Sequence, residues 1–497
     1  MSASTRTGET SIKRAALINM ASRYGAAVVH LVYSIVLARI LAPADFGIVA
    51  IAQVFVTFFA LFQDMGLGSA IIQRQDLESD DLSRLFGFSL VLGVCLAALF
   101  ALFGLPISAV YGEPQLMSIC WALSATVLFS TLNTVPNALL MKSRRFIVVG
   151  MRQVLCALAA SVAGVASAAL GAGPYAIVIY SISNALLAFL WNYATNRVVP
   201  QFRAMLVSVR KVFSYSAWLF GFNLINYFSR NADNLLIGYF FGTADLGNYG
   251  KAYQLMQMPQ TYLTSMVAGV VHPMLAEQQD DLDRIYYVFV RMTKVLSLIG
   301  VLVSILCLFA ADEIVDLLYG PQWTSSAVYL RCLAVSIWSQ MVCGASGPMF
   351  QVLNRTKEQF VRGALIACAV VGGILTGVAL GSVEAVAAFV GASYWVAFLL
   401  LLPFLIRRSF GRSIIAFLRM LVPDALIAVG VSLVLFLLNP LPLQGTLSLV
   451  VKTLAAGITW LALIVALGQS KWLEALLPTR LRRKLHRPSE RNSHDKA

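Results

Sequence analysis

Residues 86–110 read FGFSLVLGVCLAALFALFGLPISAV, a run of 25 residues without a charged side chain. A helix needs about 20 apolar residues to cross a bilayer, so this run is long enough to span one. The rest of the chain has the same character: of its 497 residues, 59% are hydrophobic and 12% are charged, and its mean hydropathy is +0.78. Soluble domains carry about 25% charged residues. This composition predicts a polytopic membrane protein and excludes soluble cytosolic and nuclear proteins.

Fourteen apolar runs are expected to cross the membrane. Because unpaired backbone groups are not tolerated in lipid, they predict an all-α bundle of fourteen transmembrane helices. The runs are 15–41, 46–72, 86–110, 116–140, 147–170, 174–196, 212–241, 246–275, 287–310, 324–350, 361–380, 384–406, 420–438 and 447–468.

The basic residues predict the orientation. The chain carries 37 Lys and Arg against 23 Asp and Glu, a net charge of +14. We place 31 of the 37 basic residues on the side of the N-terminus. The other six divide between the opposite side (Arg39, Lys251, Arg331, Lys452) and the spans themselves (Arg23, Arg230). Cytoplasmic loops carry the excess of Lys and Arg, so both termini are expected in the cytoplasm. The positive charge therefore needs no nucleic-acid partner.

The chain also resembles itself. Ala44-Asp45-Phe46-Gly47 recurs as Ala244-Asp245-Leu246-Gly247, and 80–84 recurs as 280–284, both at an offset of 200. Tyr111, Pro136 and Phe146 find later partners in Tyr319, Pro348 and Phe360. A collinear series of this kind predicts two parallel six-helix lobes, an arrangement found in transporters that alternate around a central site. The expected divisions are an N-terminal lobe at 1–200, a C-terminal lobe at 201–412, two extra helices at 413–470 and a basic cytoplasmic tail at 471–497.

Polar residues inside spans usually face an interior or a water-filled cavity. They lie at helical spacing in the equivalent spans 1, 2, 7 and 8, so we predict that they line one central cavity. The predicted substrate-binding residues are Arg23, His30, Gln53, Asn226, Arg230, Asn234, Lys251, Tyr253, Gln254 and Gln257. Arg23, Arg230 and Lys251 would make the cavity cationic and suited to an anionic cargo group such as phosphate.

Several of these residues have a purely structural alternative. Arg230 and Asp233 could neutralise each other as an i,i+3 pair, Arg23 could extend toward the headgroups, and His30 could be a hydrogen-bonded packing residue. Asp64 and Asp233, taken as the only acids well inside spans, are candidates for carrying a coupling proton or sodium ion.

Other chemistry is not expected. The seven cysteines are isolated, without metal-ligand or redox spacing, and no nucleotide-binding loop occurs, so we predict no metal, no cofactor and no catalytic residues. The acid pair Asp281 and Asp283 is interpreted as the start of a helix. The chain is therefore expected to be a transporter and not an enzyme.

Several motifs together resemble a known family. Leu37 to Gly47 (LARILAPADFG), Asp64 to Gly68, Phe228 to Gly238 and Leu318 to Trp323 (LYGPQW) are similar to segments of the polysaccharide transporter family, which belongs to the multidrug/oligosaccharidyl-lipid/polysaccharide exporter superfamily. The resemblance covers roughly residues 12–410. It departs from the family pattern at Tyr239, where many relatives carry a basic residue.

The resemblance implies a flippase that carries undecaprenyl-pyrophosphate-linked oligosaccharides across the bacterial inner membrane by alternating access, for exopolysaccharide or lipopolysaccharide synthesis. Arg23, Arg230 and Lys251 would attract the pyrophosphate or acidic sugars, and Tyr253 with the Gln and Asn side chains would contact the sugars. Membrane lipids, a polysaccharide polymerase and export machinery are the implied partners.

Three alternatives remain open at this point. A cation-coupled multidrug exporter or a peptidoglycan-precursor flippase would share the superfamily fold. A membrane-embedded polysaccharide polymerase or ligase would need catalytic Arg or His on a sizeable outer loop, and the longest predicted outer loop, about 311–323, has no basic residue.

Overall fold

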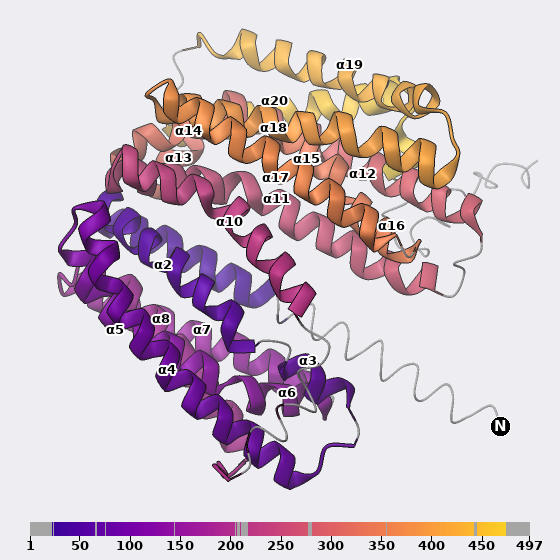
Figure 1. Cartoon of the computed structure of the whole chain (residues 1–497). Helices are drawn as coiled ribbons and strands as arrows, with labels where there is room; N and C mark the ends of the chain where they lie inside the picture. The colour runs from indigo at the N-terminus through magenta and orange to yellow at the C-terminus, as the bar shows by residue number, and fades with distance from the viewer. Residues whose placement is uncertain are drawn as a thin grey trace, which may run out of the picture. The chain divides into compact units, whose positions relative to one another are not determined.

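The computed structural model describes residues 22–473, apart from 23, 65–66, 75, 144, 204, 206–208, 210–216, 277–280, 354 and 442–444. All regular secondary structure in this part of the chain is helical (Figure 1). Ten of its helices are long and apolar enough to cross a membrane, or eleven if one bent pair counts as a single span. The chain is thus a multi-pass membrane protein of the predicted all-α class. The number of fourteen spans stays a prediction.

The chain divides into two compact units. The first comprises Met1–Gly250, Leu318–Ser325 and Gly381–Val383, and the second comprises Lys251–Leu317, Ser326–Leu380 and Glu384–Ala497.

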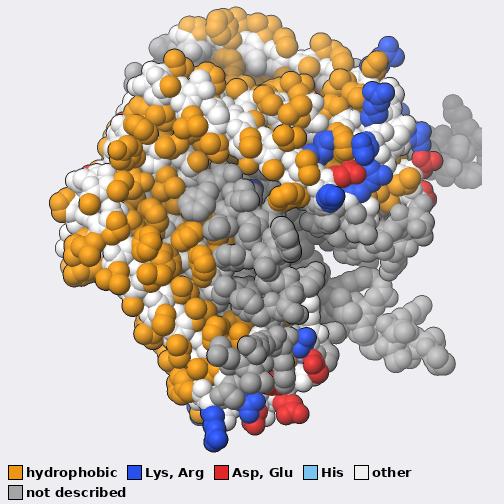
Figure 2. All heavy atoms as spheres, in the orientation of Figure 1, with side chains coloured by type: hydrophobic (Ala, Val, Ile, Leu, Met, Phe, Trp, Pro, Cys, Tyr) orange, Lys and Arg blue, Asp and Glu red, His pale blue; other side chains and the backbone are white. Residues whose placement is uncertain are grey.

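On the face seen in Figure 2, hydrophobic side chains cover much of the length of the helices, and charged side chains gather near helix ends. This is the distribution that a lipid surround requires, because charges are costly at its centre.

Unit 1 is built from long antiparallel pairs, in which α4 packs along α5 and α7 packs along α8. Its helices are Tyr24–Ile40, α2 (Pro43–Asp64), α3 (Leu67–Gln73), α4 (Ser79–Tyr111), α5 (Gln115–Leu132), α6 (Thr134–Lys142), α7 (Phe146–Ala169), α8 (Tyr175–Thr195), α10 (Ala217–Phe240), the start of α11 (Thr243–Ala276) and the short η1 (Pro321–Trp323).

The two copies of the repeated Ala-Asp-X-Gly motif cross each other in unit 1. Gly47 of α2 lies against the backbone of Thr243, so a Cβ added there would overlap the Thr243 carbonyl oxygen. Gly247 of α11 lies in the same way against the carbonyl oxygen of Pro43. The absence of a side chain at both positions therefore lets the starts of α2 and α11 approach at backbone contact, as small residues do between membrane helices.

A second motif closes on the same region. The indole Nε1 of Trp323 and the amide Nε2 of Gln322 each donate to the carbonyl oxygen of Ala38, both at 2.8 Å. The Trp323 ring also packs edge-on against Phe46, with centroids 5.3 Å apart. The LARILAPADFG and LYGPQW segments are thus in direct contact, although about 280 residues separate them.

Unit 2 contains most of α11 and all or most of each later helix except η1. They are α12 (Leu282–Phe309), α13 (Ala311–Tyr319), α14 (Thr324–Ala334), α15 (Ile337–Gly344), α16 (Ser346–Val352), α17 (Thr356–Ala379), α18 (Val383–Phe404), the π-helical η2 (Leu405–Ser409), α19 (Ile414–Leu438), α20 (Gly445–Ala466) and α21 (Ser470–Leu473). The predicted span 324–350 is broken here, with a bend of 52° between the segments Pro321–Ala334 and Ile337–Gly344.

The acid pair Asp281 and Asp283 marks a helix start, as predicted. The Asp281 carboxylate accepts the backbone N–H of Arg284 at 3.0 Å and so caps α12. Such a cap satisfies one of the N–H groups that the first turn of a helix leaves unpaired.

Two ion pairs attach α19 and α20 to the rest of unit 2. Lys294 of α12 and Asp424 of α19, both fully buried, meet at 2.5 Å. Beyond the C-terminal end of α12, Lys452 of α20 pairs with Glu313 of α13, also at 2.5 Å. Apolar side chains of α12, α19 and α20 fill the space between the pairs, with Leu298 among the most buried.

The expectation that Asp64 and Asp233 are the only acids well inside spans is wrong. Asp424 lies within the predicted span 420–438 and is fully buried. Its carboxylate is saturated by Lys294 Nζ and by Ser297 Oγ, which donates to Oδ2 at 2.6 Å. Lys294 also donates to the carbonyl oxygen of Met420 at 2.6 Å. These contacts offset the desolvation cost that normally keeps charged residues out of membrane spans.

We expect Gly47→Ala to destabilise the protein by roughly 1–3 kcal/mol, because the new methyl group forces the starts of α2 and α11 apart. Gly250→Ala is the matched control, since a Cβ at this helical glycine meets no atom within 4 Å. Denaturant unfolding in detergent micelles measures both. Equal stability of the two variants would contradict the close crossing.

We expect Asp424→Ala to cost about 3–5 kcal/mol, because it leaves the Lys294 ammonium buried without its counter-charge. The double variant Lys294→Met with Asp424→Leu should recover most of this loss, since apolar residues can replace a buried pair at little cost. Thermal unfolding of the purified protein measures the difference. A single variant as stable as the double one would rule out a buried pair.

Candidate functional site

The polar helix α10 packs against α2 within unit 1. The hydroxyl of Tyr227 donates to the carbonyl oxygen of Val54, and Gly238 lies close to Ile51. The structure thus brings together two of the four helices that the sequence analysis assigned to one cavity, the predicted spans 2 and 7.

Asp233 is buried in this part of unit 1 and held by neutral groups. Its Oδ1 accepts the backbone N–H of Asn234 at 2.8 Å, and its Oδ2 accepts the hydroxyl of Tyr249 at 3.0 Å. The alternative of an Arg230–Asp233 pair is not realised, because no ion pair joins them among the residues that the structure describes. Arg230 is instead exposed.

The predicted residues of the eighth span lie in unit 2. Lys251 is buried, and Gln254 and Gln257 are half-buried along the same helix, α11. The hydroxyl of Tyr253 lies 3.2 Å from that of Tyr394 on α18. Tyr253 is therefore held by a neighbouring helix of its own unit.

The remaining candidates are in the first half of the chain. Gln53 is exposed on α2. His30 is also exposed and stacks on Tyr33 and Tyr180, with the Tyr180 hydroxyl 3.5 Å from its Nδ1. Arg23 lies outside the described residues, as do the side chains of Asp64 and Asn226.

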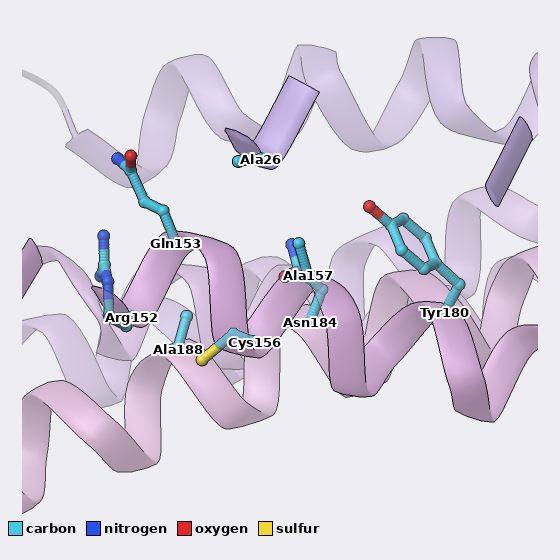
Figure 3. Close-up of a pocket in the computed structure, with 8 residues that line it drawn as sticks. All are labelled: Ala26, Arg152, Gln153, Cys156, Ala157, Tyr180, Asn184 and Ala188. Atoms are coloured by element: carbon cyan, nitrogen blue, oxygen red, sulfur yellow. The ribbon is translucent and has the colours of Figure 1, made fainter. Parts of the chain in front are cut away.

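A pocket of about 340 Å³ opens among the helix Tyr24–Ile40, α7 and α8, all in unit 1. Figure 3 shows Arg152 and Gln153 at one end and Tyr180 at the other, with Ala26 on the facing helix. Ala26, Arg152, Gln153, Cys156, Ala157, Tyr180, Asn184 and Ala188 line it. Tyr180, which lines the pocket, stacks on His30, so one of the predicted site residues lies next to the pocket.

Arg152 was missed by the sequence analysis, which counted it with the loops. It lies inside α7, whose span candidate runs from Ile147 to Ala169, and only 8% of it is exposed. Its Nη1 donates to Asn137 Oδ1 at 3.2 Å. The signal was present in the sequence, because the predicted span 147–170 already enclosed this arginine.

An amide cluster continues from Arg152 toward a second pocket. Asn192 on α8 donates to Asn133 Oδ1 at 2.7 Å and approaches Asn137 Oδ1 at 3.5 Å. Asn133 and Asn137 in turn line a pocket of about 370 Å³ together with residues of α3 and α6. Unit 1 therefore carries a polar interior that connects two hollow regions.

The family model described as "Polysaccharide biosynthesis protein" matches residues 36–328. The chain belongs to this family. The resemblance drawn from the motifs is thereby confirmed, and the match includes the whole of both the LARILAPADFG and LYGPQW segments.

Curated relatives agree with the family. The chain is 25% identical to the lipopolysaccharide biosynthesis protein WzxC of Escherichia coli (strain K12), over 66% of this chain and 68% of that protein. It is 24% identical to the succinoglycan biosynthesis transport protein ExoT of Rhizobium meliloti (strain 1021), over 70% of each.

Solved structures share the fold. The lipid II flippase MurJ in an inward closed conformation superposes with a TM-score of 0.72 at 13% identity, covering 91% of this chain and 99% of that one. An inward-facing multidrug resistance MATE transporter of the MOP superfamily gives a TM-score of 0.60 at 16% identity, covering 77% and 96%. The fold is therefore MurJ- and MATE-like.

We expect Tyr249→Phe to destabilise the protein by about 1–3 kcal/mol, because it removes one of two hydrogen-bond donors from the buried Asp233 carboxyl. Tyr253→Phe is the matched control: its hydroxyl lies against the neutral Tyr394 hydroxyl and not against a carboxylate, so its removal should cost about 1 kcal/mol or less. Thermal unfolding in detergent compares the two. A larger loss in the control would refute the role given to Tyr249.

Proposed function

We propose that the chain is a flippase that moves undecaprenyl-pyrophosphate-linked oligosaccharide units from the cytoplasmic to the outer leaflet of the bacterial inner membrane. The observation that carries the proposal is membership of the polysaccharide biosynthesis family, with relatives named for lipopolysaccharide and succinoglycan biosynthesis. The cargo would supply polymer synthesis at the outer face, with a polymerase and export machinery as partners.

The proposed topology has fourteen spans in two pseudo-symmetric six-helix lobes, with both termini in the cytoplasm. The mutual packing of Gly47 and Gly247, at equivalent places in the repeated motif, supports the two-lobe arrangement. The lobes would alternate around a central site and carry the cargo without covalent chemistry, so we do not assign the chain an enzymatic step.

The proposed cargo site uses positive charge from both halves of the chain. Arg230 supports this role, because it is exposed and has no ion pair to an acid among the described residues. A guanidinium binds phosphate through two parallel hydrogen bonds, which suits the pyrophosphate of the cargo. Lys251 and Arg23 would add to the positive electrostatic potential of the cargo site. The residues that would contact sugar hydroxyls are Gln53, Asn226, Asn234, Tyr253, Gln254 and Gln257.

The fold alone does not choose between this function and multidrug export, since a lipid II flippase and a MATE transporter are both structural neighbours. The charges favour an anionic cargo. Organic cations call for acidic walls, and Asp233, an acid on the polar helix α10, is already bound by Asn234 and Tyr249. Asp233 and Asp64 remain our candidates for ion coupling.

In a deletion strain, we expect loss of surface polymer and accumulation of its lipid-linked precursor, and the intact gene should restore export. Arg230→Ala should abolish this restoration while the protein stays in the membrane, because the cargo's phosphate loses its guanidinium. Arg331→Ala is the control, since Arg331 already pairs with Asp312. Full polymer yield from the Arg230→Ala strain would count against the assignment.

A further inference from the structure

The charge of Arg152 is not balanced within the described part of unit 1. The side chain is more than nine-tenths buried, and its Nε has no hydrogen-bond partner. Its one recorded hydrogen bond goes to the neutral amide oxygen of Asn137, and no ion pair to an Asp or Glu is found for it among the described residues. Burying a cation without a counter-charge costs several kcal/mol, and the described residues supply no anion that would offset this cost.

The neighbouring amides do not supply that anion. Asn137 Oδ1, the acceptor for Arg152, is also approached by Asn192 Nδ2, whose main acceptor is Asn133. Both donors therefore converge on neutral carbonyl oxygens. The amide dipole of Asn137 holds the guanidinium of Arg152 in place but does not neutralise its positive charge.

The pocket beside Arg152 has the size and lining for an anionic group. At about 340 Å³ it is far larger than the share of about 30 Å³ that one water molecule takes in the liquid. Hydrogen-bond donors surround it: the guanidinium, the amide groups of Gln153 and Asn184, and the hydroxyl of Tyr180 (Figure 3). A phosphoryl group offers oxygens alone, which matches this excess of donors.

We propose that this pocket binds the phosphoryl group of a polyprenyl-diphosphate-linked saccharide, with Arg152 as the anion-binding side chain. The inference rests on the proposed function and adds a site within unit 1 that is separate from Arg230 and Lys251. Its apolar wall, from Ala26, Ala157 and Ala188, would exclude water around the ion pair and strengthen it.

The other half of the chain offers a natural comparison. Arg362 lies at the same distance from the start of α17 as Arg152 does from the start of α7. Its guanidinium stacks on Phe404, 3.1 Å from the ring centroid, and its Nη1 donates to the carbonyl oxygen of Leu400 at 3.3 Å. Arg362 is thus satisfied by its own unit, whereas Arg152 faces a pocket.

Thermal unfolding of the purified full-length protein in detergent tests the proposal with three lipid probes. Undecaprenyl diphosphate carries the phosphoryl group, undecaprenol has the same chain without it, and phosphatidylglycerol presents the phosphoryl group of a bulk lipid. We expect undecaprenyl diphosphate to raise the apparent unfolding temperature of the wild type in a saturable manner, and undecaprenol to leave it unchanged.

Arg152→Gln should lower the apparent affinity for undecaprenyl diphosphate roughly tenfold or more, because a charge-assisted hydrogen bond is lost. Arg152→Lys keeps the positive charge but loses the planar guanidinium, so its affinity should lie between those of the wild type and Arg152→Gln. Ala188→Leu fills the pocket while keeping the guanidinium of Arg152, and it should also weaken binding. This variant covers the case that Arg152→Gln does not fold. Arg362→Gln is the control and should bind as the wild type does.

Unchanged affinity in both Arg152→Gln and Ala188→Leu would overturn the proposal. An equal, Arg152-dependent effect of phosphatidylglycerol would overturn the assignment to cargo and give the site to bulk lipid. The deletion strain separates this inference from the proposed function. Polymer export in the strain that lacks the gene would contradict the proposed function. If the wild-type gene restores export but lipid binding does not depend on Arg152, only the proposed site is contradicted.

Discussion

The low dielectric of the bilayer core is the constraint on which the structure depends. A charge inside a span must be neutralised, hydrogen-bonded or placed at a hollow that water or a ligand can fill. Lys294 and Asp424 meet this requirement with a direct ion pair and with hydrogen bonds to Ser297 and Met420. The same requirement explains why a helix as apolar as α19 keeps an aspartate: it is the fixed point by which α19 is attached to α12.

The spans could be predicted from the sequence because hydropathy is a local property. Every predicted run overlaps helix in the described residues, and the start of α12 follows from the local acids near Asp281. The break inside 324–350 was not predicted, because that run stays apolar across the bend and no charge marks it. The runs also passed over Arg152 and Asp424, since a single charge hardly changes the mean hydropathy of a span.

The partners of buried charges could not be predicted, because they come from distant parts of the chain. Lys294 and Asp424 are 130 residues apart, and Lys452 and Glu313 are 139 apart. The internal repeat, in contrast, indicated a contact between distant parts of the chain as well as the number of helices. The glycines of the two Ala-Asp-X-Gly copies are the positions at which two helix starts touch, so a sequence pattern of weak individual matches reflected a definite backbone contact.

The buried charges of the protein are held in two different ways. Two of the buried cations of unit 2, Lys294 and Lys452, each have an acid within 2.5 Å, and both pairs fix α19 and α20. In unit 1, Arg152 and Asp233 are held by neutral amides and a hydroxyl. A charge that is neutralised by an opposite charge on a neighbouring helix stabilises the fold. A charge that is held only by neutral dipoles keeps its attraction for a ligand of opposite sign. On this physical ground we place the recognition of an anionic group at the pocket beside Arg152, on the helices Tyr24–Ile40, α7 and α8 of unit 1.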